Sequence, residues 1–189
     1  PAHFFDDETG IYVEGTNGIP GFCRNDPVNW NQDWERPIHL SMFGTDGTEL
    51  FAAKTGVKIG GGCSRSYAQK SLNIYLRRNT YGSNPIDYPI FSGRENHEYR
   101  RLKLRNSGQD YLRTMFRDGL VQTLLWDKVD IDLQAFRPSV LYINGAYWGI
   151  HNIRELFTDE YFNQHYNIDQ LDLDLIKNPA MPWVEVKTG

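Results

Sequence analysis

The stretch VLYINGAYWGI, residues 140–150, predicts a β-hairpin that starts near Ser139. Two runs rich in aromatic and branched side chains flank Asn144 and Gly145. An Asn-Gly pair tolerates positive φ at both central positions of a turn, as a type I′ hairpin turn requires. The sheet that contains this segment is therefore expected to be antiparallel here.

Further elements are predicted on both sides of this hairpin. Apolar and polar residues alternate in four runs, which is typical of half-buried strands: 38–42, 50–59, 70–78 and 101–105. Residues 111–126 carry apolar side chains at helical spacing, with Ser107 or Asp110 as the N-cap. A shorter helix is predicted over 158–166 with Thr158 as N-cap, and a strand over 171–176. The expected fold class is α+β: a mostly antiparallel sheet with a long amphipathic helix and a hairpin.

Residues 1–36 differ from the rest because they are rich in Gly, Asn and Pro, which favour turns. We expect an irregular arm, fixed to the domain by Trp30 and Trp34, since tryptophan rarely stays fully exposed. Sugar binding by these two side chains is the alternative. Residues 37–189 are expected to form the domain proper.

Composition excludes several classes of protein. Hydrophobic residues make up 40% of the 189 residues and aromatic residues 14%, which is enough to bury a core and argues against disorder. The net charge of −4 and the lack of a basic run argue against a nucleic-acid partner. No apolar run reaches the ~18 residues that a membrane-spanning helix needs.

The chain contains two cysteines, Cys23 and Cys63, and begins at Pro1 without a methionine. The cysteines either form one disulfide in an oxidising compartment or are two separate buried thiols, because their spacing decides neither. The missing methionine indicates a processed or trimmed chain.

A glycine-rich segment is the first candidate binding element. Gly60, Gly61 and Gly62 are followed by Ser64 and, at the start of the next predicted strand, by Lys70. Glycines let backbone N–H groups approach phosphate oxygens, and a lysine can add a positive charge. The spacing is not that of a Walker motif. The alternative is a glycine-rich turn with an exposed Lys70.

Two further charged segments are candidates. Arg105 and Asn106 precede the predicted long helix, whose N-terminus favours anions, although a capped turn is the alternative. Arg154 and Glu155 follow the hairpin, where Arg154 could contact a phosphate and Glu155 could pair with Lys70 or with another cation. A surface ion pair is the alternative. The aspartates at 130, 132, 169, 172 and 174 lack the rest of a calcium loop, so no metal ligands are predicted.

Taken together and in order, five segments resemble the CotH (spore coat protein H) kinase-like family: GGCSRSYAQKSL (61–72), LRNSGQD (104–110), FRD (116–118), FRP (136–138) and YINGAYWGI (142–150) followed by Arg154-Glu155. The openings FFDDETGIYV and DWERPIHL are similar to the segments that precede this domain in secreted members.

The resemblance implies an atypical protein-kinase fold that binds ATP and Mg²⁺ and phosphorylates Ser or Thr of a protein substrate, such as a spore coat protein. It implies an extracellular or cell-surface location. Carried onto this sequence, it makes Lys70 the phosphate-contacting lysine, in a loop with Gly61, Gly62 and Ser64. It places Arg105, Asn106 and Arg154 near the nucleotide, and makes Glu155 a candidate catalytic carboxylate.

The sequence departs from the family pattern in ways that bear on activity. The family's metal-binding aspartates belong to a later segment, and Trp126-Asp127 is not that motif. Gly60 and Ala68 replace a common histidine and proline. We therefore expect the N-terminal part of a kinase domain, truncated and without Mg²⁺-dependent ATP turnover of its own. A non-catalytic extracellular module that binds a glycan or a protein is the alternative function. Oligomeric state stays open.

Overall fold

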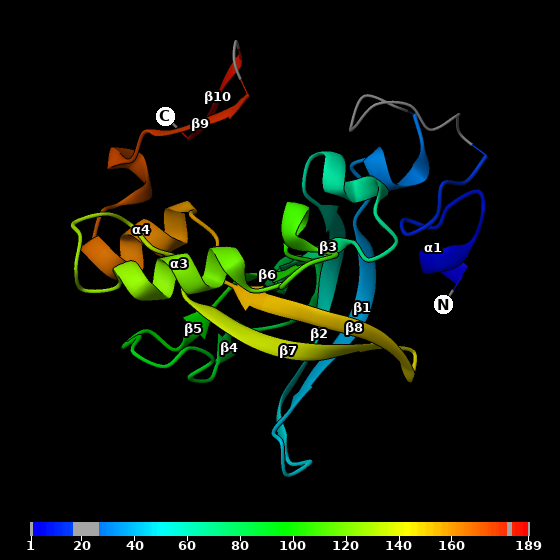
Figure 1. Cartoon of the computed structure of the whole chain (residues 1–189), viewed down its shortest axis with the longest axis horizontal. Helices are drawn as coiled ribbons and strands as arrows, with labels where there is room; N and C mark the ends of the chain where they lie inside the picture. The colour runs from blue at the N-terminus through cyan, green and yellow to red at the C-terminus, as the bar shows by residue number, and fades with distance from the viewer. Residues whose placement is uncertain (1, 17–26, 181–182, 189) are drawn as a thin grey trace.

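The computed structural model describes residues 2–16, 27–180 and 183–188, with side chains described over 4–16 and 27–176. Its centre is a six-stranded sheet in the order β1-β2-β3-β6-β8-β7, and each neighbouring pair is antiparallel (Figure 1). The strands are β1 Arg36–Phe43, β2 Glu49–Gly60, β3 Ser71–Tyr75, β6 Arg101–Arg105, β7 Phe136–Ile143 and β8 Ala146–Arg154. The predicted α+β class with a mostly antiparallel sheet is confirmed.

The two faces of this sheet differ as the alternating sequence predicts. One face is apolar and forms the centre of the core, with the buried side chains of Val57, Ile59, Leu72, Ile74, Leu102, Leu104 and Ile153. The other face is polar over β3 and β6, since every second residue of these strands points away from the core. This polar face is where the candidate site lies.

The predicted hairpin is confirmed as β7 and β8. Asn144 and Gly145 connect the strands with φ values of 53° and 82°. These positive values are the reason for the Asn-Gly pair, because most other residues would be strained there. The run predicted over 70–78 is shorter than expected, because Arg78 already begins α2 (Arg78–Tyr81).

The N-terminal arm packs on the core through aromatic and aliphatic side chains. It contains α1 (Ala2–Phe5) and the 3-10 turn η1 (Asn29–Asn31), and its buried hydrophobic residues are Phe4, Ile11, Tyr12, Val28 and Trp30. Trp34 packs against the same cluster. In the described parts of the arm, both tryptophans thus contact the hydrophobic core.

The long amphipathic helix predicted over 111–126 is wrong in length and in burial. The observed α3 spans Arg117–Leu125, preceded by the 3-10 turn η3 (Gly108–Asp110) and by a left-handed Met115 with φ of 61°. Polar contacts hold this irregular start: the Ser107 hydroxyl and the Asn152 amide both donate to the carbonyl of Met115. Much of the apolar surface predicted for this helix is exposed, most of all Leu112, which precedes α3 and is 85% exposed.

Asp110 explains why the chain turns before it becomes helical. Its carboxylate accepts hydrogen bonds from the Thr114 hydroxyl and from the backbone N–H of Arg117. The Thr114 contact and the N–H donors outweigh partial desolvation and lower the pKa of Asp110 to about 2. The carboxylate therefore caps α3 from seven residues away.

The remaining elements lie around the sheet. Helix α4 (Asp159–Tyr166) is confirmed, and its N-cap Thr158 accepts from the N–H of Tyr161. The strand predicted over 171–176 is wrong at its start, which forms the 3-10 turn η4 (Gln170–Asp172), capped by Asp169. Two small two-stranded sheets complete the described chain: β4 Ile86–Asp87 with β5 Glu98–Tyr99, and β9 Leu175–Ala180 with β10 Trp183–Thr188.

Within the described residues, no helix has both the length and the apolar character needed to cross a membrane. Over the same residues, no group of three or more His, Cys, Asp or Glu side chains is arranged to hold a metal ion.

Candidate functional site

The glycine-rich segment ends in a short 3-10 turn, η2 (Cys63–Ser66). The Arg65 guanidinium closes it by donating to the carbonyls of Gly61 and Trp30. Gly61 has φ of 107° and lies against the Ser64 hydroxyl, so a side chain at Gly61 would clash. Cys63 is disulfide-bonded, while Cys23, the other cysteine, lies outside the described residues. The phosphate role predicted for Gly61, Gly62 and Ser64 stays a prediction.

Lys70 is buried beneath the arm. Only 3% exposed, it lies with Nζ 4.0 Å from the centre of the Trp30 ring and 5.4 Å from that of Tyr12. Nζ donates to the carbonyls of Arg65 and Tyr67 at 2.7 and 2.8 Å. Burial lowers the pKa of this ammonium to about 8, while the ring faces and carbonyls favour its charged form. In this structure Lys70 holds the arm to the glycine-rich segment.

Replacing Lys70 should therefore loosen the arm. We expect Lys70→Met to lower the free energy of unfolding by about 2 kcal/mol, because a desolvated cation–π contact is lost and two carbonyls lose their donor. Urea denaturation followed by tryptophan fluorescence measures this. The control Lys58→Met removes a solvent-screened pair with the exposed Asp33 and should cost less than about 0.5 kcal/mol. Equal losses in both variants would contradict the role given to Lys70.

Asn106 is fully buried and connects β6 to β3. Its Oδ1 accepts from the Ser71 hydroxyl and from the N–H of Gly108, and its Nδ2 donates to the carbonyl of Gln69. These bonds engage both the oxygen and the nitrogen of the side-chain amide. Its predicted contact with a nucleotide is untested, and its visible role is to fix the chain where β6 ends.

Glu155 pairs with Arg94 and not with Lys70. Its Oε2 accepts from Arg94 Nη2 at 2.7 Å and from the N–H of Ala135 at 2.7 Å, and its Oε1 lies 3.3 Å from His165 Nε2. The Arg94 guanidinium stacks over Trp126 at 4.2 Å. The sequence offered Lys70 or another cation as the partner of Glu155, and the structure shows that the partner is Arg94. Its catalytic role stays a prediction.

Arg105 and Arg154 are the two predicted site residues that the structure brings together. Pairing of β6 with β8 places Arg105 opposite Asn152 and Lys103 opposite Arg154. Both guanidinium groups then contact one carboxylate, Asp118 at the start of α3, at 2.6 Å from Arg105 Nε and 3.1 Å from Arg154 Nη1.

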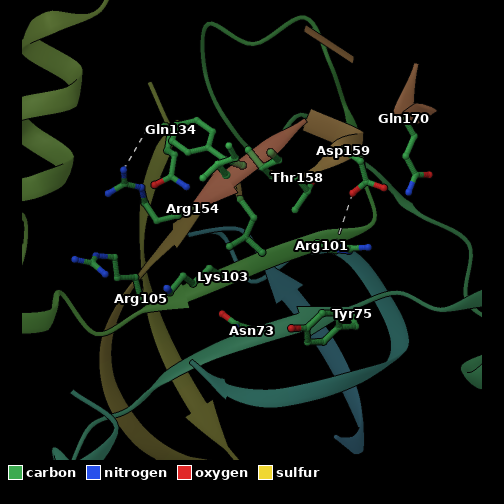
Figure 2. A pocket seen from close by; sticks show the side chains of 14 residues that line it. Asn73, Tyr75, Arg101, Lys103, Arg105, Gln134, Arg154, Thr158, Asp159 and Gln170 are labelled. Atoms are coloured by element: carbon green, nitrogen blue, oxygen red, sulfur yellow. Dashed lines mark hydrogen bonds and ion pairs between the residues drawn. The ribbon is translucent and has the colours of Figure 1, made fainter. Parts of the chain in front are cut away.

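These arginines belong to a cavity of about 810 Å³ on the polar face of the sheet. The cavity lies between β3, β6 and β8 on one side and the segments around Thr158 and Gln170 on the other (Figure 2). Its described lining carries four cationic side chains against the one carboxylate of Asp159; the four are Arg101, Lys103, Arg105 and Arg154. The size is in the usual range for a small-molecule site, and the excess of cations favours an anionic ligand.

Arg154 is the least ordinary member of this set. Its side chain is 1% exposed, and its Nε has no hydrogen-bond partner among the described residues. Burial lowers the pKa of Arg154, Asp118 opposes this effect, and Arg105 adds to it, yet a guanidinium stays charged. A buried charge with an unused donor is costly for a fold, which makes a ligand-binding role the simplest reason to keep it.

Sequence reasoning missed Arg101, Lys103 and Asn73 as members of the cavity lining. The signal for the first two was present, because basic residues alternate along Arg101-x-Lys103-x-Arg105 and so share one face of a strand. Asn73 joins them because β3 pairs with β6 and sets Asn73 opposite Lys103. That pairing is not visible in the sequence.

Comparison with family models matches residues 57–181 to the family described as CotH kinase protein. The chain belongs to this family. The match includes every motif from the glycine-rich segment to Glu155, and with them the whole lining of the cationic cavity, but not the arm. No curated protein sequence matches the chain.

Proposed function

We propose that this CotH family chain binds ATP in the cationic cavity, as part of a protein kinase that phosphorylates Ser or Thr. The cavity is the observation that carries the proposal, since a kinase needs positive charge around the transferred phosphate. Three cations, Arg101, Lys103 and Arg105, follow one strand, and Arg154 lies beside them on the next. Guanidinium groups match phosphate oxygens in geometry as well as in charge.

The triphosphate would lie along β6 and β8, near Lys103, Arg105 and Arg154. Tyr75 and Phe157 in the same lining offer aromatic surface for a purine. The predicted loop with Lys70 lies outside this lining, so we assign the phosphate contacts to Arg105, Arg154 and Lys103. In the reaction, the hydroxyl oxygen of the protein substrate would bond to the γ-phosphorus, ADP would leave, and the hydroxyl proton would be released.

A Mg²⁺ ion is implied by the family, and the described residues do not fit one. The cavity lining contains Asp159 as its only carboxylate among the described residues, and Asp159 already pairs with Arg101. Magnesium needs several oxygen ligands in octahedral geometry. We therefore assign no step to a metal, and attribute to this chain the binding and orientation of the phosphates.

An extracellular or cell-surface location is part of the proposal. The disulfide at Cys63 supports it, because disulfides persist in oxidising compartments and are rare in the cytosol of most organisms. Coat proteins of a spore would be protein substrates in such a location.

A nucleotide series tests the binding function directly. We expect the melting temperature to rise most with ATP, less with ADP, little with AMP and not with adenosine, because the cavity recognises phosphate. A ligand at one hundred times its Kd stabilises by about 2.7 kcal/mol. Equal shifts with ATP and adenosine would contradict phosphate recognition. A shift with an oligosaccharide and none with ATP would favour a glycan-binding module.

A further inference from the structure

Asp118 covers the two arginines that the proposed phosphate site needs. Its Oδ2 accepts from both Arg105 Nε and Arg154 Nη1, while its side chain stays 32% exposed. Arg154 beneath it is 1% exposed. A phosphate that uses both the Arg154 Nη1 and the Arg105 Nε donors therefore has to displace the Asp118 carboxylate.

The carboxylate stands where a phosphate oxygen would be bound. Carboxylate and phosphate oxygens use the same guanidinium donors, at similar distances. A phosphate oxygen could also reach Arg154 Nε, which has no partner among the described residues, and could thus offer what Asp118 does not. Two anions cannot share this position without strong repulsion.

The backbone that carries Asp118 is held in place, so its side chain is the part that can move. A Cβ atom at Gly119 would lie 2.7 Å from the Phe136 ring, which shows how closely the first turn of α3 packs on β7. Rotation of the Asp118 side chain toward solvent needs no change in that packing. The rotation breaks one hydrogen bond, from the N–H of Gly119 in the first turn of α3 to Asp118 Oδ1.

We propose that Asp118 is an internal competitor for the anion site, displaced when the phosphates of ATP bind. This inference rests on the proposed function, since it concerns the same cavity. It makes Asp118 a regulator of affinity: the site is competent only in the fraction of molecules whose carboxylate has rotated away. The apparent affinity is reduced by that fraction.

The sign of one substitution distinguishes competition from positioning. If Asp118 only orients the two arginines, Asp118→Asn should weaken phosphate binding. If it competes with phosphate, the same variant should bind more tightly, by about tenfold when the open fraction is about a tenth. Isothermal titration with ATP, and separately with inorganic tripolyphosphate, measures this for the 189-residue chain.

Asp159→Asn is the matched control. Asp159 lines the same cavity and pairs with Arg101 at 3.8 Å, so the variant removes one negative charge without uncovering Arg154. We expect a clearly smaller gain than with Asp118→Asn. Equal gains would reduce the effect to net charge and overturn the inference.

A measurement on the unaltered protein removes the dependence on a folded variant. The Nε–H resonances of Arg105 and Arg154 should both shift when tripolyphosphate is added, because one loses Asp118 and the other gains an acceptor. An unchanged Arg105 resonance at saturation would mean that Asp118 stays in place, and would overturn the inference. Unchanged or weaker ATP binding by Asp118→Asn would also overturn the inference, but it would leave the proposed function, ATP binding in this cavity, standing. No binding of either probe by any of the proteins would overturn the proposed function as well.

Discussion

Arg154→Met is expected to remove most of the affinity for ATP while leaving the protein folded. The guanidinium is the buried member of the cationic set, with an unused Nε directed at no other described group. Loss of a buried, charge-assisted contact to phosphate costs about 3 kcal/mol, which is about a hundredfold in Kd. Titration calorimetry with ATP measures this loss.

The same variant should be as stable as the parent chain, or more stable. Methionine fills similar space, and replacing a buried charge by an apolar side chain is often neutral or stabilising. The change does not leave Asp118 without a cationic partner, because its carboxylate keeps the contact with Arg105 at 2.6 Å and its side chain remains partly exposed. Affinity and stability are therefore expected to respond differently.

Arg100→Met is the control for the removal of one positive charge. Arg100 precedes Arg101 in the chain, is 49% exposed and pairs only with the exposed Glu98 among the contacts described for its charged group. Its loss should change the Kd for ATP by less than about twofold. If Arg154→Met kept its affinity, or failed to fold, the assignment of Arg154 to the phosphate site would be wrong.

Glu155→Gln is expected to destabilise the fold by about 3 kcal/mol, the cost of leaving a buried cation without its counter-charge. The variant keeps the shape of the side chain but removes the charge that Arg94 needs at 2.7 Å. Arg94 also donates to the carbonyl of Leu133 and stacks on Trp126, so it cannot turn to solvent without breaking these contacts. Urea denaturation at neutral pH measures the loss.

The pH dependence of this difference has a definite sign. Burial alone would raise the pKa of Glu155, but hydrogen bonds from His165 and Ala135 and the charge of Arg94 outweigh it and lower the pKa below the ordinary value of 4.5. A lowered pKa contributes stability above the unfolded value and loses it as pH falls through the folded value. The gap between the parent and Glu155→Gln should thus be full at pH 7 and close only below about pH 4.5.

Two further variants make this prediction specific. Glu98→Gln breaks a pair in which both side chains are about half exposed, 52% and 49%, and should cost less than about 0.5 kcal/mol. The double variant Arg94→Met with Glu155→Met should recover much of the loss, since an apolar pair can replace a buried ion pair. A Glu155→Gln variant as stable as the parent would show that the pair does not hold the fold.

The strands and the hairpin followed from local sequence, because the alternation of side chains along a strand and the φ values of Asn144 and Gly145 are local properties. The start of the long helix could not be predicted in this way. The spacing of its apolar residues is helical from residue 111 onward. However, Asn152 and Ser107 donate hydrogen bonds to the carbonyl of Met115 and hold this residue in a left-handed conformation. Contacts between distant residues thus overrode a local preference.

The candidate site, like the fold, has features that local sequence determines and features that depend on contacts between distant residues. Sequence by itself determined the family, the antiparallel sheet and the basic character of Arg105 and Arg154, since motifs and alternation are written along the chain. Tertiary structure decided which charges meet. The pairing of β6 with β8 brought Lys103 beside Arg154, and α3 brought Asp118 to both arginines. Lys70 went to Trp30 and Glu155 to Arg94. The physical reason is that a charge is held by whichever group lies within a few ångströms after folding, and strand register sets that distance.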